Sequence, residues 1–377
     1  MAKNQQTEGH VVEIVRLGSM PQYVHQGLTV SAVKQSILSK QAYYSGLKNY
    51  ADLENLVFKL QPDVVYVHDR NPHFSGNILI NIKSSLPKCK IIGVYHSPGQ
   101  SCPNRSLIHS EGNICDGKLK IHLCTQCRIG KSKGVLTGRI ASIFSLTSEK
   151  LSGNPLSEVT HANYYTESYI KAFILWVDAL DTVQYHAQWV KDLLLLNGVK
   201  EEKLKYHSLE TVYNFKATET KRKPITNKLQ LVCSGRCTNI KGQLVLLEAL
   251  EQLDNECQEQ IELHFIGPGF DGEDDYAVQV RRKIEAMPFV LKPQLLKPES
   301  VDAFLQDKHL GIVPSLWPET GPLVVLDFLK AGMQVISSPY IGIENKAIEH
   351  FEYGNSSSLV KVIENVIHEN FEVYNIK

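Results

Sequence analysis

Short apolar runs alternate with amphipathic stretches along the whole chain of 377 residues, and this alternation constrains the fold more than any other feature. Short apolar runs bounded by turn residues predict buried strands, and helical stretches between them predict the crossover connections of parallel α/β sheets. The predicted strands are residues 11–17, 64–68, 91–96, 179–185, 229–234, 261–267, 310–314 and 334–337. The clearest predicted helices, 244–253 and 323–331, each closely follow a strand.

A polar and basic stretch divides the chain. Residues 216–228 (KATETKRKPITNK) contain one proline and almost no apolar side chains, which is typical of a linker. We therefore predict two domains, residues 1–215 and 229–377, each long enough for one doubly wound, Rossmann-like sheet. Within the first domain, residues 97–156 are rich in Gly, Cys, Ser and Lys and are expected to form a long loop.

The charges balance, with 40 Lys and Arg against 40 Asp and Glu. This balance argues against a nucleic-acid partner, which usually requires a basic face, but it leaves a local basic patch open. The first residues carry no apolar signal-peptide core, and no apolar run approaches the roughly 20 residues that span a bilayer. We expect a cytoplasmic protein without a transmembrane segment, for which peripheral membrane contact is still open.

Two cations follow the strand at residues 229–234. Gly235 and Arg236 end this strand, and Lys241 precedes the next helix. Because ligands bind at the carboxyl ends of parallel strands, Arg236 and Lys241 are candidates to hold two adjacent phosphates. The alternative is a solvated loop that happens to carry two cations.

A second loop, VPSLWPETGP, precedes the helix predicted at 323–331. Pro322 is expected to open this helix and to leave the amides of Leu323 and Val324 at the positive end of the helix dipole, where they would bind an anion. Glu319 precedes the helix and Asp327 lies inside it, so the two carboxylates would grip hydroxyls at opposite ends of a ligand. Singly, each carboxylate would also serve as an ordinary helix-terminal or solvent-facing charge.

These motifs together resemble the donor-binding domain of the family 4 glycosyltransferases, retaining enzymes with the two-domain GT-B fold. The matching motifs are Gly235-Arg236, Lys241-Gly242, Gly267-Pro268-Gly269, Pro314-Ser315, Glu319 to Asp327, Ala331-Gly332 and Val335-Ile336. The resemblance implies that Arg236 and Lys241 hold the diphosphate, Glu319 the sugar, the Leu323 and Val324 amides the distal phosphate, and Asp327 the ribose. Gly235, Gly267 and Gly321 would let the backbone approach the ligand.

Two positions depart from the family pattern. Gly321-Pro322 replaces the usual Phe-Gly, a change compatible with the motif because Pro322 removes only one N–H. Asp327 replaces the second Glu and is one methylene shorter, which weakens its assignment to ribose.

The N-terminal half carries a fainter resemblance to the acceptor domain of the same family. His96 matches a family histidine near the donor sugar, although a strand-end histidine bonded to a neighbouring loop is the alternative, and His68 is a weaker candidate. Residues 9–14 resemble the second strand of that domain, so the first strand and its Gly-rich loop are missing. A shortened gene product, a partner chain or rebuilt segment at the incomplete sheet, and lost activity are three explanations that the sequence leaves open.

Four cysteines lie in the predicted loop, and the last two of them form a C-x2-C pair. Tetrahedral zinc would suit four thiols, but only one close pair is present, so free thiols or a redox-sensitive disulfide stay as alternatives. The candidate ligands are Cys102, Cys115, Cys124 and Cys127.

The resemblance implies a retaining, metal-independent hexosyltransferase of glycan or glycoconjugate synthesis, with a UDP-, GDP- or ADP-linked sugar as donor and an unidentified hydroxyl as acceptor. The rival hypothesis, motivated by the missing N-terminal elements, is a non-catalytic sugar-nucleotide-binding protein or a regulatory partner of a complete transferase. A dinucleotide-dependent oxidoreductase is disfavoured because no G-x-G-x-x-G follows a strand.

Overall fold

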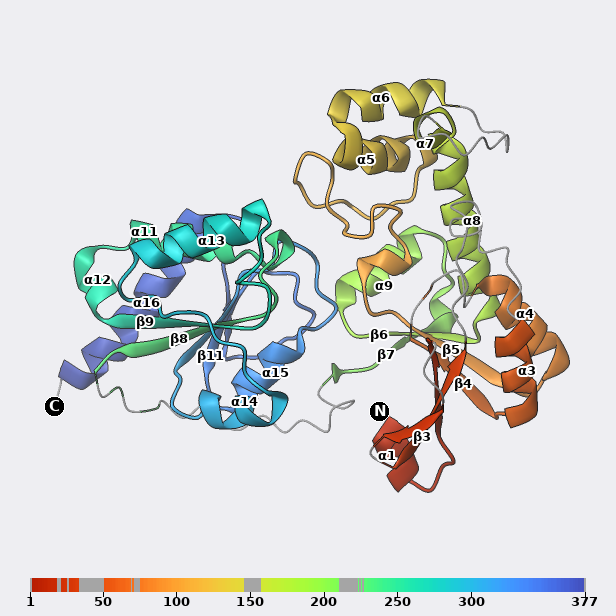
Figure 1. Cartoon of the computed structure of the whole chain (residues 1–377), viewed down its shortest axis with the longest axis horizontal. Helices are drawn as coiled ribbons and strands as arrows, with labels where there is room; N and C mark the ends of the chain where they lie inside the picture. Colours follow the sequence, from red (N-terminus) through yellow and green to blue (C-terminus); the bar gives the residue numbers. More distant parts are fainter. Residues whose placement is uncertain are drawn as a thin grey trace. The chain divides into compact units, whose positions relative to one another are not determined.

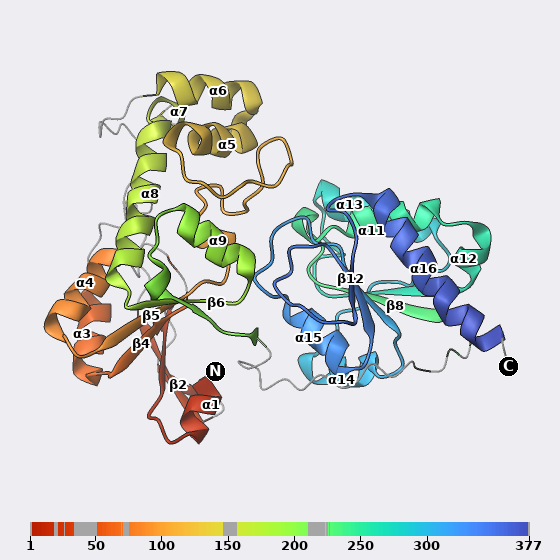
Figure 2. The ribbon, with the colours of Figure 1, turned by 180° about the vertical axis from the view of Figure 1, so that it is seen from behind.

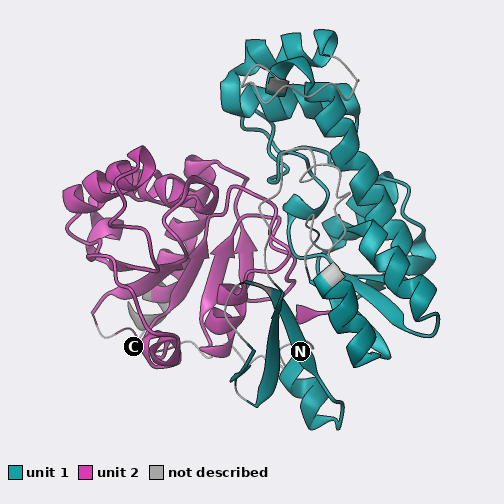
Figure 3. Cartoon of the chain, turned by 45° about the vertical axis from the view of Figure 1, so that its right-hand side comes forward, with its two compact units in different colours: residues 1–207 teal, residues 208–377 magenta. Residues whose placement is uncertain are grey.

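The computed structural model describes residues 2–18, 22–25, 27–33, 51–68, 70, 75–145, 157–209, 223, 225 and 227–375. The chain divides into two compact units, Met1–His207 and Ser208–Lys377, drawn in different colours in Figure 3. The division lies a few residues before the boundary at 215 that the sequence suggests. Most of the stretch assigned to a linker, 216–228, falls outside the described residues.

The C-terminal unit is built on a parallel sheet with the strand order β12-β11-β10-β8-β9. Strand β8 pairs with the end strand β9 from Leu229↔Ile261 to Ser234↔Ile266, which fixes the register of these two strands. The strands are β8 (Leu229–Ser234), β9 (Ile261–Ile266), β10 (Leu310–Val313), β11 (Gln334–Ser337) and β12 (Ile348–His350).

Helices cover both faces of this sheet, as a doubly wound fold requires. Helices α11, α13 and α16 lie on one face and α14 and α15 on the other (Figures 1 and 2). Each face has its own buried apolar cluster, because the strands are apolar on both sides. The helices are α11 (Gln243–Gln252), α12 (Asn255–Glu259), α13 (Asp275–Ala286), α14 (Pro298–Leu305), α15 (Leu323–Lys330) and α16 (Ser356–Asn375).

The N-terminal unit contains a parallel sheet with the order β4-β5-β6-β7. Its long helix α8 buries Tyr165, Tyr169, Phe173 and Trp176, so these aromatic side chains form a core face of the helix. The strands are β4 (Val64–Val67), β5 (Lys90–Val94), β6 (Thr182–Tyr185) and β7 (Leu204–Tyr206). The helices are α3 (Ala51–Leu60), α4 (Gly76–Ser85), α5 (Ile121–Lys133), α6 (Val135–Phe144), α7 (Ser157–Thr160), α8 (Ala162–Ala179) and α9 (Gln188–Leu196).

A separate three-stranded sheet with the order β1-β3-β2 lies near the start of the chain. It consists of β1 (Glu13–Leu17), β2 (Tyr23–His25) and β3 (Leu28–Val33), preceded by α1 (Ala2–Thr7). Among the described residues, β4 pairs with β5 alone, so β4 forms an edge of its sheet.

All eight predicted strands are present, but the region 97–156 is not a continuous loop. Two helices, α5 and α6, occupy its middle and pack against each other beside the amino end of α8 (Figure 1). The prediction failed there because the large apolar residues of α6 do not face a core, so the usual helical signal was misleading. No helix of the described residues is long and apolar enough to cross a bilayer.

Candidate functional site

The sheet of the C-terminal unit has a switch point beside β8. The chain leaves β8 toward β9 on one side, and β10 lies on the other side. In doubly wound sheets, ligands bind at the carboxyl ends of strands at such a point. The loops at this position are residues 235–242, after β8, and residues 314–322, after β10.

Glycines allow these loops to touch through their backbones. A Cβ at Gly242, whose φ is +71°, would lie 1.9 Å from the carbonyl oxygen of Pro314. A Cβ at Gly267, whose φ is +138°, would lie 2.2 Å from the carbonyl oxygen of Gly235. No side chain fits at either place, so the loops after β8, β9 and β10 form one continuous backbone wall.

Lys241, Ser315 and Glu319 meet between the two loops. The ammonium of Lys241 lies 2.6 Å from Oε1 of Glu319, and the hydroxyl of Ser315 donates to the same oxygen at 2.6 Å. The Glu319 side chain is 8% exposed and that of Lys241 is 21% exposed. A carboxylate so far from water needs such partners, and both predicted residues are therefore fixed at the switch point.

The backbone of Glu319 is held as firmly as its side chain. Its N–H donates to the carbonyl of Tyr340 at 2.7 Å, which ties the loop to the segment after β11. The ammonium of Lys241 also lies 5.9 Å from the ring centre of Trp317. Ser315 and Trp317 were not among the predicted site residues, although both stand in the same short loop as Glu319.

Arg236 differs from Lys241 in being exposed. Its carbonyl oxygen accepts a hydrogen bond of 2.8 Å from the side chain of the buried Gln243, which fixes the backbone and leaves the guanidinium at the surface. The arrangement supplies one fixed cation and one exposed cation in the same loop.

Helix α15 begins at Leu323, with Pro322 as its N-cap and not as its first helical residue. The prediction that Pro322 opens the helix was thus wrong by one position, because the ψ of Pro322, 120°, is extended. Leu323 and Val324 still form the first turn, so their amides stand at the positive end of the helix dipole. Gly321, at φ +134°, is packed against Leu209, where a Cβ would lie 1.8 Å from a methyl carbon.

Asp327 lies in the second turn of α15 and is partly buried. Desolvation, with a further contribution from the charge of Asp302, raises the pKa of this carboxyl. The charges that act on it therefore come from α14 and from Lys330, whereas Glu319 interacts with Lys241.

In the N-terminal unit, histidines follow the carboxyl ends of the parallel strands. Nδ1 of His68, after β4, lies 2.9 Å from Nε2 of His96, after β5, and their rings stack at 5.1 Å. The ring of His186, after β6, lies 5.9 Å from that of His96. Desolvation, and then the neighbouring imidazoles, lower the pKa of His96 to about 4, so the cluster is neutral at pH 7.

Hydrogen bonds to the side chain of Gln100, which is fully buried, hold the loop that carries His96. The side-chain oxygen of Gln100 accepts from the backbone N–H groups of His96 and Ser97, and its amide donates to the carbonyl of Val94 at 2.9 Å. Sequence reasoning missed His186 and Gln100. A signal was present, because a Tyr-His pair occurs at the carboxyl end of each of β5, β6 and β7: the tyrosine is the last residue of β6 and β7 and directly follows β5.

The four predicted zinc ligands lie close to or within the helical hairpin of α5 and α6. Their thiols are free, and the side chain of Asn104 donates to Sγ of Cys127 at 3.4 Å. Among the residues that the structure describes, no group of three or more His, Cys, Asp or Glu side chains is arranged to hold a metal ion. Zinc binding by Cys102, Cys115, Cys124 and Cys127 stays a prediction.

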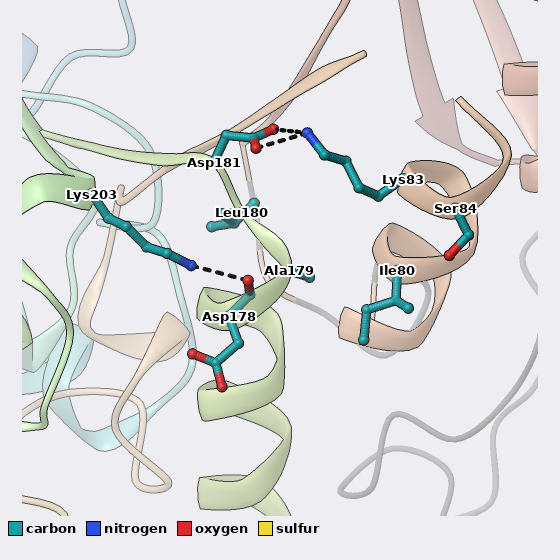
Figure 4. Close-up of a pocket in the computed structure, with 8 residues that line it drawn as sticks. All are labelled: Ile80, Lys83, Ser84, Asp178, Ala179, Leu180, Asp181 and Lys203. Atoms are coloured by element: carbon teal, nitrogen blue, oxygen red, sulfur yellow. Dashed lines mark hydrogen bonds and ion pairs between the residues drawn. The ribbon is translucent and has the colours of Figure 1, made fainter. Parts of the chain in front are cut away.

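A pocket of the N-terminal unit lies at the opposite end of the sheet from the histidines. Figure 4 shows Lys83 and Asp181 paired at its wall, with an Nζ–Oδ2 distance of 2.6 Å, and Lys203 donating to the carbonyl of Asp178. Asp181 also accepts from the backbone N–H of Ile91 at 2.8 Å. These side chains satisfy one another and join β5, β6 and α4, which is a structural role.

Known proteins place this geometry in context. Residues 215–374 match the family model described as "Glycosyl transferases group 1", and this range contains every predicted residue of the C-terminal site. No curated protein matches the sequence significantly.

Solved structures resemble the chain along most of its length. A glycosyltransferase from Rickettsia africae ESF-5 is 14% identical, with a TM-score of 0.57, over 99% of this chain and 83% of that one. Sucrose-phosphate synthase from Thermosynechococcus elongatus is 12% identical, with a TM-score of 0.57, over 98% and 82%. Anabaena Alr3699/HepE, solved with UDP and glucose, is 15% identical, with a TM-score of 0.53, over 90% and 77%. At these identities the likeness shows the fold, which is GT-B: two Rossmann-like units with parallel sheets.

Proposed function

We propose that the chain is a retaining hexosyltransferase that moves a hexose from a nucleotide diphosphate sugar to a hydroxyl acceptor. The observation that carries this proposal is the cluster of Lys241, Ser315 and Glu319 at the switch point of the C-terminal sheet. It lies inside the range matched by the glycosyltransferase family model. A cation and a carboxylate held together there offer one group for phosphate and one for sugar hydroxyls.

The donor would bind with its diphosphate at the loop after β8. Arg236 and Lys241 would neutralise the phosphates, and the amides of Leu323 and Val324 would bind the distal phosphate. Glu319 would accept hydrogen bonds from the sugar. Asp327 is proposed for the ribose, since a carboxyl with a raised pKa gains stability when hydroxyl groups donate to its charged form.

The reaction breaks the bond between the anomeric carbon and the leaving phosphate oxygen and forms a bond to the acceptor oxygen on the same face. The proton of the acceptor hydroxyl passes to the leaving phosphate. Lys241, Arg236 and the amides of α15 would stabilise the charge that develops on this phosphate without a metal ion. His96, neutral at pH 7, is proposed to bind a substrate hydroxyl.

Nucleotide binding tests the proposal first. UDP is the first candidate, because Anabaena Alr3699/HepE was solved with UDP and glucose; GDP and ADP are the comparisons. A nucleotide at 100 times its Kd stabilises a protein by about 2.7 kcal/mol, which a thermal shift detects. We expect Arg236→Ala to abolish the shift and Arg282→Ala, a change at an exposed arginine of α13, to leave it intact. A lack of any shift in the unaltered protein would contradict the proposed site.

Turnover tests the activity itself. Release of free nucleotide from UDP-glucose, UDP-galactose and their GDP and ADP counterparts would be measured with simple hydroxyl acceptors, and slow hydrolysis would count as activity. The anomeric configuration of the product, read by proton NMR, tests retention.

A second candidate function is a non-catalytic sugar-nucleotide-binding protein. It is favoured by the position of β4, which within the described residues has a strand neighbour on one side only. Nucleotide binding with no transfer and no hydrolysis would support this alternative over the transferase.

A further inference from the structure

Helix α6 exposes a continuous apolar face. Leu136, Ile140, Ile143 and Phe144 are 71%, 49%, 70% and 77% exposed. They follow one another at the i, i+4, i+7, i+8 spacing that aligns side chains on one side of a helix. Contiguous exposed apolar side chains of this size mark an interaction site in a folded protein.

The inner face of α6 has the opposite character, being formed by Gly138, Ala141 and Ser142. A Cβ at Gly138 would lie 2.3 Å from the carbonyl oxygen of Gln126 and 2.9 Å from Cα of Gly130, so the backbones of α5 and α6 are in contact. The hairpin is therefore held together by small residues. The four large apolar side chains of α6 point away from α5. An ordinary surface helix has the reverse arrangement, with its large apolar side chains buried and its small or polar ones exposed.

The segment that forms the hairpin carries an excess of positive charge. Residues 117–144 contain six Lys and Arg and no Asp or Glu, in a chain whose total charge is zero. Lys118, Lys120, Lys131, Lys133 and Arg139 are exposed. Arg139 forms an exposed ion pair of 3.5 Å with Glu111, which offsets one of the six charges.

An apolar helix face bordered by basic residues matches one class of partner. Lipid headgroups of anionic bilayers attract Lys and Arg, and the apolar face enters the boundary between headgroups and acyl chains while the helix lies parallel to the surface. A protein partner with the same complementarity would need an acidic rim around an apolar groove. A second copy of the chain could also cover the apolar face, and the dimer would then be the interaction.

The hairpin is also well placed for this contact. In Figures 1 and 2, α6 lies at the outer end of the N-terminal unit, at the end of α8 remote from the sheet, where it packs against α5, α7 and α8.

We propose that the exposed face of α6, with the basic residues of α5 and of the preceding loop, docks on the surface of anionic lipid bilayers. This inference goes beyond the proposed transferase activity and does not depend on it. Because one short helix provides the contact, the docking is reversible and sensitive to salt.

Vesicle sedimentation of the full chain tests the proposal. We expect binding to vesicles of phosphatidylcholine with phosphatidylglycerol, at least about tenfold weaker binding to phosphatidylcholine alone, and release when ionic strength rises from about 0.1 M to about 0.5 M. The double variants Ile140→Ser/Phe144→Ser and Lys131→Glu/Lys133→Glu should each weaken binding to the anionic vesicles by about tenfold or more. The four side chains are exposed, so the thermal midpoint should not change.

Matched controls lie in the other unit. Leu295→Ser, at a leucine that is 74% exposed, and Lys292→Glu/Lys297→Glu should bind as the unaltered protein does. Equal losses in control and α6 variants, or no binding to anionic vesicles, would overturn the proposal. So would a dimer in solution that Ile140→Ser/Phe144→Ser dissociates, because the apolar face would then be covered by a second copy.

Discussion

Lys241 and Glu319 stand 78 residues apart and join two loops of one sheet through a contact of 2.6 Å. The ion pair has a dual character. It satisfies a carboxylate that is almost buried, and it holds the ammonium at the position that we propose for a phosphate. A bound diphosphate would compete with Glu319 for Lys241, which would free Glu319 for the hydroxyl groups of a sugar.

The first prediction separates these two roles. Lys241→Met leaves the Glu319 carboxylate with Ser315 as its remaining hydrogen-bond donor from the cluster, so we expect the free energy of unfolding to fall by about 1–3 kcal/mol. Adding Glu319→Gln removes the buried charge and should restore most of this loss. Nucleotide binding should stay lost in both, because neither contains the cation. Denaturant unfolding and nucleotide titration would measure the two effects.

Lys330→Met is the control, since Lys330 pairs with Asp302 at 2.6 Å with both side chains more than half exposed. A change near zero is expected for such a surface pair. If the double variant binds nucleotide as well as the unaltered protein does, Lys241 is a structural residue only.

The second prediction compares two glycines of nearly equal φ. Gly242 (+71°) would place a Cβ 1.9 Å from Pro314, whereas a Cβ at Gly332 (+73°) would have no atom within 4 Å. Gly332→Ala should therefore cost about 1 kcal/mol for the left-handed backbone alone. Gly242→Ala should cost at least about 2 kcal/mol more, because the two loops must separate.

Nucleotide binding should weaken in Gly242→Ala and stay unchanged in Gly332→Ala. Equal destabilisation of the two variants would show that the loop contact at Pro314 contributes nothing, and the continuous backbone wall would lose its support.

The sequence was most informative where local pattern and packing agree. The apolar runs predicted every strand of the C-terminal site because parallel strands are buried on both faces. The convergence of Lys241 and Glu319 followed from the rule that ligand sites lie at strand carboxyl ends. Helix α6 could not be predicted in this way, since its large apolar residues face outward and Gly138 and Ala141 face inward.

The role of Ser315 also depended on three-dimensional contact. A serine after a strand is common, and only the structure shows its hydroxyl on the same oxygen as the ammonium of Lys241. Likewise, β2, β7 and β12 are three-residue strands at sheet edges, where few buried residues exist to create a pattern.

The third prediction concerns pH. The folded protein holds the pKa of His96 at about 4, below its ordinary value of 6.5, and lowers those of His68 and His186 by desolvation. Between these values the unfolded chain binds more protons than the folded chain, so the free energy of unfolding should fall as pH drops from about 6.5 toward about 4. His96→Asn should reduce this slope, as measured by urea unfolding at several pH values.

His10→Asn, at an exposed histidine outside the cluster, is the control and should leave the slope unchanged. Carboxyl groups that titrate in the same range are common to all three proteins, so the difference between slopes isolates His96. An unchanged slope in His96→Asn would contradict a neutral, desolvated imidazole at this position.

The fourth prediction concerns the thiols near α5. Desolvation raises the pKa of Cys115 to about 12 and that of Cys124 to about 11, and it also raises the pKa of Cys127. Because the thiolate is the nucleophile, these protonated thiols should react with iodoacetamide at pH 7 far more slowly than a free thiol does. Peptide mass spectrometry of the alkylated protein would give the rate at each cysteine. Unfolding in urea, which removes the burial, should make all of them react at one fast rate.

Zinc would protect the same thiols by a different route, so the measurement is repeated after treatment with a strong chelator. We expect the slow rates to be unchanged, since burial does not depend on a metal; faster alkylation after chelation, with zinc released in proportion, would instead establish the tetrathiolate site that the C-x2-C spacing predicts.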